Sequence, residues 1–502
     1  MNGLNEYTEE KRIYSGFESV FAWLCLLLGY LFCRSASALH LALISLCVNS
    51  LTLLALYKKG VKIKAKSLFL CLLSLAFSFS VVITPELTAL LSLFCSMLLY
   101  SLFLYSASGG SLKAAGSDLL PLNMLLAIKG AKIGDLADYF RLLMPRKSKS
   151  FKQLLYIALG LCAAVIPTMV VVSLLSYDGG FVGLLDKSFA FLKNFSLKSQ
   201  ISSLLFGLII AIYLFGLYSV NTEKRDYVDI EKYIGLVEKI RVAPASAVAA
   251  AFIPLAVVYA FFFVSQWQYY LSAFSGVLPE GVENYAEYAR QGFFELCSVS
   301  GINFALLAVA SLLQKRKCNA EKLVLKAVSL LFSLMTLVLI GTALAKMLLY
   351  IDRFGLTVKR VLASWFIVLL ALIFIAVILR CFLPRFKLFT VSCCAVLAMV
   401  LLLSASNYKG LIADYNVDAF ISGKTERIDI TALYKLGEPS TPAMVRLAKY
   451  YESNGDDGAE EYSRLRNMLD ERREEQKKKG FLRFSLPKHL ESNALEEYYG
   501  EK

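Results

Sequence analysis

The sequence predicts an all-α protein, a polytopic transmembrane helical bundle of about eleven spans with a small C-terminal helical extension. Composition is the first reason. Of the 502 residues, 57% are hydrophobic and 18% are charged, whereas soluble domains are nearer to 45–50% apolar and about 25% charged. The second reason is the grouping of the apolar residues in runs of about 20, which cross a bilayer as helices. The mean hydropathy of +0.59 agrees with both.

The apolar runs divide the chain into a transmembrane bundle over residues 1–405 and a soluble helical tail over residues 406–502. The expected spans are residues 17–33, 37–57, 67–83, 87–106, 153–176, 200–220, 245–267, 295–314, 323–349, 362–383 and 388–405.

Loop charge predicts the orientation of these spans. Alternate loops carry about 26 Lys and Arg residues on one side and about 8 on the other, and basic loops stay in the cytoplasm. The segment "KKGVKIKAK" at 58–66 is the densest basic loop. We therefore expect a cytoplasmic N-terminus and, with eleven spans, an extracytoplasmic tail. The net charge of +14 lies in these loops, so we expect no nucleic acid partner.

Motifs for metal or nucleotide chemistry are missing from the sequence. It contains two histidines, His40 and His489, and no HExxH, loop CxxC or GxxxxGK[ST] motif. Eleven cysteines lie almost entirely in apolar runs, where small packing residues are common. We expect no metal, no cofactor and no assigned catalytic residue, and we favour a protein that is not an enzyme.

Two cytoplasmic loops contain amphipathic patterns. Leu136, Tyr139, Phe140 and Leu143 share one helical face in residues 134–144, beside the basic "RKSKSFK". A second stripe lies in the loop 221–241 and consists of Ile230, Tyr233, Ile234 and Val237. The simpler interpretation is two helices on the bilayer surface in contact with anionic lipid; the alternative is two docking helices for an unknown protein partner.

Charged residues within spans are candidates for function. Lys326 and Lys346 lie at opposite ends of one span, and Arg380 is near the cytoplasmic end of the next. These long side chains can reach the membrane surface from there. Glu295 is short and sits where the chain enters the membrane, so it is the more unusual residue.

Three polar stretches lie on the same predicted side of the membrane. In "NYAEYARQGFFELCSV" (284–299), Tyr285, Tyr288 and Glu295 fall on one helical face. The second is "YIDRFGLTVKR" (350–360), with Gly355 as expected C-cap and Thr357 as expected N-cap, and the third is "SNYKGLIADYNVDAF" (406–420). They predict a ligand site or a structural polar cluster made of Tyr285, Tyr288, Arg290, Glu295, Asp352, Arg353, Arg360, Asp414, Asn416 and Asp418.

The motifs "YAEYARQGFFEL", "YIDRFGLTVKR" and "IADYNVD" followed by "IDITALYKLG" resemble an uncharacterised group of bacterial polytopic membrane proteins. This group is Domain of Unknown Function 4173, with its relative 4153. The resemblance covers roughly residues 200–440. It implies a multi-pass protein of the bacterial cytoplasmic membrane, and it implies no reaction, substrate or catalytic residue.

The tail is expected to hold a small helical hairpin. Thr441 and Pro442 are typical of a helix start, "NGDDG" interrupts this helix, and residues 459–479 form a charged second helix. We expect the remaining C-terminal residues to be loosely ordered.

Three hypotheses for function follow. The first is an envelope-associated ligand-binding or transport component, with the polar cluster as its outer site. The alternative is a non-enzymatic scaffold or sensor, which contacts partners through its tail and its amphipathic loops. A membrane transferase for lipid-linked substrates, with Glu295 or Asp352 as base, is the third.

Overall fold

The fold is all-α, as predicted. The computed structural model describes residues 16–34, 37–83, 87–107, 139–140, 142–143, 197–222, 238–265, 285–315, 318–383, 385–454, 459–477 and 484–500. Within these ranges the regular elements are helices, joined by one isolated β-bridge between Ala243 and Gln314. That bridge ties the segment before α11 to the end of α13.

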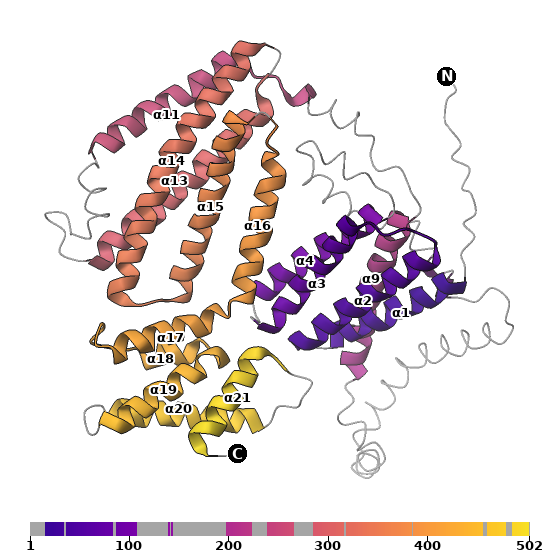
Figure 1. Cartoon of the computed structure of the whole chain (residues 1–502), viewed down its shortest axis with the longest axis vertical. Helices are drawn as coiled ribbons and strands as arrows, with labels where there is room; N and C mark the ends of the chain where they lie inside the picture. Colours follow the sequence, from indigo (N-terminus) through magenta and orange to yellow (C-terminus); the bar gives the residue numbers. More distant parts are fainter. Residues whose placement is uncertain are drawn as a thin grey trace, which may run out of the picture.

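The spanning helices form two groups that meet at α16 (Figure 1). The first group contains α1 (Gly16–Arg34), α2 (Ala38–Lys58), α3 (Ala65–Ile83), α4 (Leu87–Ala107) and α9 (Leu197–Thr222). The second group contains α11 (Ala245–Ser265), α13 (Tyr285–Leu313), α14 (Asn319–Phe354), α15 (Val358–Phe382) and α16 (Leu388–Ala405).

Nine of the helices in the described ranges are long and apolar enough to cross a membrane, and α1 holds a shorter apolar helix at Phe17–Cys33. Together these ten helices correspond to ten of the expected spans. The eleventh expected span, 153–176, lies outside the described residues. The chain is therefore a polytopic helical membrane protein.

Contacts between helix termini show which ends of the helices lie together. Lys59, just after α2, pairs with Glu18 at the start of α1 over 2.7 Å. The hydroxyls of Ser67 and Ser106 are 2.8 Å apart, so the start of α3 lies beside the end of α4. We call this end of the bundle the basic end, because the loop with Lys58–Lys66 belongs to it.

The opposite end carries the C-terminal residues, and we call it the tail end. Ser92, near the start of α4, donates a hydrogen bond of 2.6 Å to Ser404 at the end of α16. The connection 355–357 between α14 and α15 and the whole tail lie at this end as well (Figure 1). The start of α13 lies there too, since α13 and α14 are joined at the basic end and pack together.

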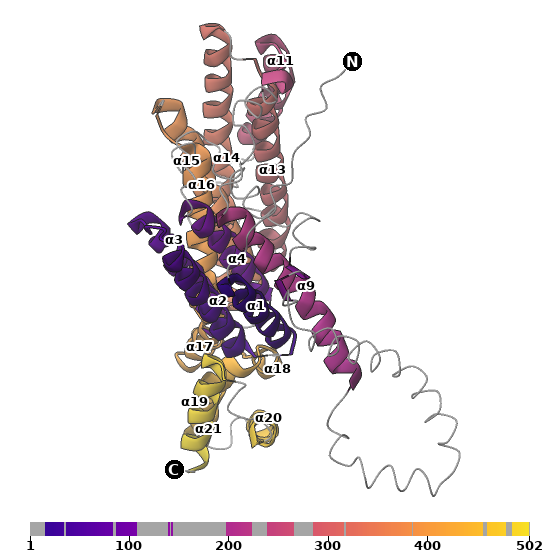
Figure 2. The same cartoon turned by 90° about the vertical axis from the view of Figure 1, so that its right-hand side faces the viewer.

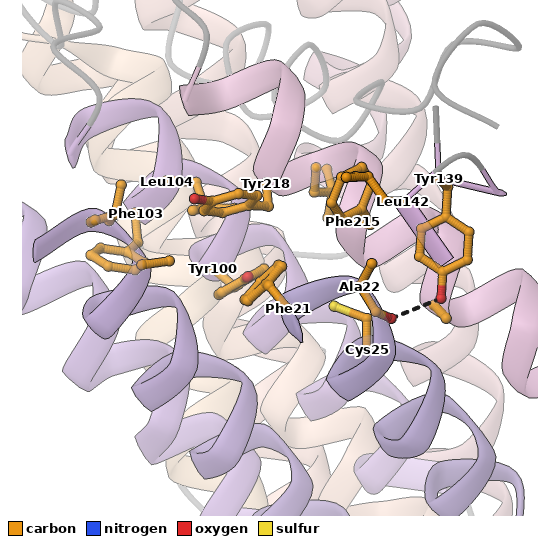
Figure 3. Packing of buried hydrophobic residues seen from close by; sticks show 14 of the residues in the cluster. Phe21, Ala22, Cys25, Tyr100, Phe103, Leu104, Tyr139, Leu142, Phe215 and Tyr218 are labelled. Carbon is orange, nitrogen blue, oxygen red and sulfur yellow. Dashed lines mark hydrogen bonds between the residues drawn. The ribbon is translucent and has the colours of Figure 1, made fainter. Parts of the chain in front are cut away.

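Aromatic side chains fill the core of the first group (Figure 3). Tyr139 is buried there, with its ring 5.4 Å from Phe215 and its hydroxyl donating to the Ala22 carbonyl over 3.0 Å. Leu143 is buried in the same core, whereas Phe140 is 37% exposed. Of this stripe, Tyr139 and Leu143 thus pack in the protein core, and Leu136 lies outside the described residues; contact of this segment with the bilayer surface stays a prediction. The other stripe, Ile230–Val237, lies outside the described residues.

The tail forms a helical layer across the tail end (Figure 1 and Figure 2). Its elements are α17 (Tyr408–Ile421), α18 (Ile430–Lys435), the 3-10 helix η3 (Glu438–Ser440), α19 (Thr441–Asn454), α20 (Ala459–Lys477) and α21 (Leu486–Tyr499). The central helix α19 is largely buried by α17, α20 and α21. Side chains of α15, among them Val361 and Trp365, pack against this core, so the tail and the spans share apolar contacts.

The expectation of a loosely ordered C-terminus was wrong. Ser485 caps α21 by accepting from the Lys488 amide, and Leu495 is buried against the tail core. Glu491 is also buried and accepts hydrogen bonds from Thr441 and Arg472 over 3.0 and 3.2 Å. The sequence did not predict this helix because most of its residues are polar or charged. Its few buried residues are nevertheless enough to fix it on the tail core.

Candidate functional site

The candidate site is the junction between the 355–357 turn and α17, where two of the three polar stretches meet. Gly355 ends α14 with φ +73°, and Thr357 caps α15 by accepting from the Arg360 amide over 3.4 Å. Arg360 then folds back over the turn. Its guanidinium donates to the Phe354 carbonyl over 2.9 Å and lies 3.9 Å from the centre of the Tyr350 ring. The turn is therefore held from both sides.

Asn416 of α17 binds this turn through both atoms of its amide. The Leu356 amide donates to Asn416 Oδ1 over 2.7 Å, and Asn416 Nδ2 donates to the Leu356 carbonyl over 2.9 Å. A Cβ at Gly355 would lie 2.5 Å from Asn416 Oδ1. Two independent features therefore require glycine at position 355: the positive φ angle and the close approach of the Asn416 side chain.

The carboxylates of α17 face a cation from the tail. Asp414 and Asp418 are one helical turn apart, and Arg446 of α19 pairs with them over 2.6 and 3.0 Å. Burial raises the pKa of Asp414, Arg446 opposes this, and the nearby Asp418 adds to it. Asp352, at the end of α14, pairs with Lys424, and this hydrogen bond raises the pKa of Lys424. The Arg446 pairs thus join two helices of the tail, and the Asp352–Lys424 pair joins the tail to the spanning helix α14.

Glu295, which had been singled out as the unusual carboxylate, lies elsewhere. It is exposed on α13 and lies within electrostatic range of Lys346 on α14. Lys346 is only 7% exposed, which corrects the expectation that its side chain extends to the membrane surface. Arg353 is exposed at the end of α14.

The remaining residues of the predicted cluster begin α13. Tyr285, Tyr288 and Arg290 lie in the first turns of that helix, at the tail end, and their side chains lie outside the described part of the structure. The structure therefore brings Asp352, Arg360 and Asn416 to one junction. It places Asp414 and Asp418 on the adjoining side of α17.

Sequence reasoning missed the partners Arg446, Lys424 and Leu356. The one available signal was the spacing of Asp414 and Asp418, since two carboxylates one turn apart favour a facing cation. Which cation faces them depends on how α19 packs on α17. Leu356 offers only backbone atoms, and sequence gives no signal for those.

A second polar group lies inside the spans of the second helix group. Tyr259 donates to Asn303 Oδ1 over 2.5 Å, and Asn303 Nδ2 donates to Thr336 Oγ1 over 2.8 Å. All three side chains are buried. Such hydrogen bonds join transmembrane helices, here α11, α13 and α14. In the part of the chain that the structure describes, no three His, Cys, Asp or Glu side chains gather to hold a metal ion.

Fold and junction together define an integral membrane protein with a helical tail fastened to one end of its bundle. Residues 67–447 match the family described as Domain of unknown function (DUF4153). The match covers more than half of the chain, and the protein therefore belongs to this family, the relative of the group 4173 that the motifs had suggested first. No curated protein and no solved structure shows significant similarity to the chain.

Proposed function

We propose that this protein is a non-enzymatic membrane scaffold or sensor that presents its helical tail to a partner protein. The observation that carries this proposal is the two-way hydrogen bond between Asn416 and Leu356. This bond, with Gly355 beneath it, sets the tail in one orientation on the spans. A tail of fixed orientation suits the presentation of a binding surface better than a flexible tether does.

The use of the polar residues also supports a scaffold. Asp352, Asp414 and Asp418 bind Lys424 or Arg446, and Arg360 binds backbone carbonyls of the turn. These contacts hold helices together and leave the groups with fewer positions for a ligand.

The second candidate is ligand or ion binding within the spans, with transport as its extension. The buried chain of Tyr259, Asn303 and Thr336 supports it, together with the buried Lys346 near Glu295. Polar groups inside a membrane are costly and often mark a pathway. The same three neutral residues could instead serve only to join helices through hydrogen bonds, and the observed contacts fit that role equally well.

We further propose that the tail faces away from the cytoplasm in a bacterial cytoplasmic membrane. The basic end carries Lys58, Lys59, Lys62, Lys64 and Lys66 in a single connection. Basic connections of this kind stay in the cytoplasm, and the tail lies at the opposite end of the helices (Figure 1).

Site-specific photo-crosslinking in native membranes tests the scaffold. A photoreactive amino acid replaces Ser463 or Asn467, which are exposed on α20, away from the spans (Figure 2). We expect a discrete protein adduct at one of these positions. The control position is Val264 of α11, which is 80% exposed in a spanning helix and should capture lipid.

The same cells carrying Asn416→Ala provide the second comparison. If the orientation of the tail set by the Asn416–Leu356 hydrogen bonds matters, the yield of the adduct at α20 should fall. The amount of protein in the membrane should stay unchanged. Absence of any protein adduct at both α20 positions, with normal lipid capture at Val264, would remove the scaffold hypothesis. Binding within the spans would then be the better candidate, and Asn303→Leu would be the variant to assay.

A further inference from the structure

A cluster of cations lies at the basic end, where α14 begins and α15 ends. The thiol of Cys381 on α15 contacts the Lys326 carbonyl of α14 over 3.8 Å, so the two helices touch here. The Lys326 ammonium lies 5.6 Å from the centre of the Phe382 ring. Arg380 donates to the Phe386 carbonyl over 3.0 Å, and both Lys326 and Arg380 act electrostatically on Cys381. Two cations from neighbouring helices thus flank one contact.

Among the described residues, no carboxylate pairs with the lysines of this cluster. Lys322 and Lys326 are one turn apart on α14, where like charges repel, and both are exposed. In the described ranges neither forms an ion pair. Glu321, the carboxylate next to Lys322 in sequence, accepts from the Cys318 amide over 3.2 Å as part of the helix cap. Glu321 keeps its negative charge in this cap, but Lys322, Lys326 and Arg380 outnumber it, so the local charge is positive and an anion would stabilise it.

Apolar side chains surround the same cations on the outside of the bundle. Leu323, Leu379 and Phe382 are 66%, 40% and 60% exposed. They belong to helices long and apolar enough to span a membrane, so we expect them to contact the lipid chains. A soluble anion gains nothing from this apolar rim, whereas a phospholipid can place its phosphate on the cations and its acyl chains on the rim.

We propose that Lys326 and Arg380, assisted by Lys322, bind the headgroup phosphate of an anionic phospholipid between α14 and α15. The aromatic ring of Phe382 holds Lys326 by a cation–π contact. Its bond to Phe386 fixes Arg380 beside the turn that leads to α16. The lipid would then join three helices of the second group at the membrane surface.

The test uses the full-length protein in nanodiscs of phosphatidylcholine, with and without phosphatidylglycerol. Thermal unfolding and native mass spectrometry report lipid-dependent stabilisation and bound phosphatidylglycerol. For the double variant Lys326→Gln/Arg380→Gln we expect the affinity for phosphatidylglycerol to fall by about tenfold or more, since both bases near the membrane surface attract the anionic headgroup. The matched control is Lys62→Gln/Lys64→Gln, which removes the same charge from another connection of the basic end.

Each outcome decides the proposal. Selective loss in the first double variant, with retention in the control and in Lys326→Arg, supports a built site. An equal loss of phosphatidylglycerol affinity in both double variants would mean that the lipid binds a diffuse basic surface, and this would overturn the proposed site. Stabilisation of the wild type by inorganic phosphate to the same extent overturns the assignment to a lipid. If the double variant does not fold, Lys326→Gln alone is compared with Lys62→Gln by the same criteria.

Discussion

Gly355 and Gly423 both adopt positive φ angles, +73° and +74°, but their surroundings differ. A methyl group at Gly423 would meet open space, whereas at Gly355 it would lie 2.5 Å from Asn416 Oδ1. We expect Gly355→Ala to destabilise the protein by about 2–4 kcal/mol. This is the sum of the backbone strain and the loss of the Asn416–Leu356 hydrogen bonds. Gly423→Ala should cost about 1–2 kcal/mol, from strain alone.

Thermal unfolding of the full-length protein in detergent measures both. The double variant Gly355→Ala/Asn416→Ala sharpens the comparison, because removing the amide relieves the clash. Its loss should be clearly smaller than the two single losses added together. Additive losses would mean that Asn416 does not hold the turn.

Glu452 offers a test of pH dependence in the tail. Tyr498 and Tyr462 donate hydrogen bonds to this carboxylate over 2.6 and 2.7 Å, and they lower its pKa below the ordinary 4.5. A lowered folded-state pKa contributes stability above pH 4.5, and this stability is lost as the pH falls through the folded-state pKa. We expect Glu452→Gln to lower the melting temperature at pH 7 and to match the wild type at strongly acidic pH.

The melting temperature of both proteins between pH 7 and pH 3 checks this. Glu460→Gln, which changes an exposed glutamate at the start of α20, controls for the loss of one charge. A constant difference between wild type and Glu452→Gln across the whole range would rule out the tyrosine hydrogen bonds as its cause.

Local features of the junction were predictable from the sequence, and its partners were not. Gly355 and Thr357 were expected to end one helix and begin the next, and the structure confirms both. Caps depend on the few residues around them, so a short stretch suffices. The partner of Asp414 is Arg446, 32 residues later, and only the packing of α19 on α17 brings it there.

Helices α1 and α9 approach each other closely at a pair of glycines. A Cβ at Gly29 would collide with the Gly207 carbonyl oxygen, and a Cβ at Gly207 would lie 2.6 Å from the Tyr30 amide. Small residues permit this approach in membranes, where van der Waals packing drives association. Gly29→Ala should therefore separate the two helices and lower the melting temperature.

Gly301 of α13 is the matched control, since it is also helical and a Cβ there would meet nothing within 4 Å. Alanine improves helix propensity at both sites by about 1 kcal/mol. Gly301→Ala should consequently be neutral or stabilising, in contrast to Gly29→Ala. Equal effects of the two substitutions would show that the glycine crossing does not limit packing.

The spans themselves were predictable, because about 20 apolar residues in a row have few other structures available to them. The pairing of spans was harder. Helices α1 and α9 are far apart in sequence, and Gly29 and Gly207 lie in runs that read as ordinary apolar segments. In the tail, the sequence did not predict the helix α21. Its few buried residues are spread among charged ones and give no clear apolar pattern.

At the scale of the whole molecule, one question connects the tail, the basic end and the proposed lipid site: which end faces the cytoplasm. Lys62 lies at the basic end, Lys359 at the start of α15 and Asn467 on α20, and all three are exposed. In the structure the start of α15 and the helix α20 both lie at the tail end (Figure 1). Single cysteines at these positions, in a chain without its eleven native cysteines, can be labelled in intact cells by a membrane-impermeant thiol reagent.

We expect Lys359→Cys and Asn467→Cys to be labelled and Lys62→Cys to react only after the cells are opened. This result would place the tail outside, where a partner must be an envelope or extracellular protein, and the proposed lipid site in the cytoplasmic leaflet. The reverse pattern would keep the junction intact but make the partner cytoplasmic. Labelling of Lys359→Cys without Asn467→Cys in intact cells, when both react in opened cells, would contradict the fold itself, because α20 and the start of α15 belong to one packed unit.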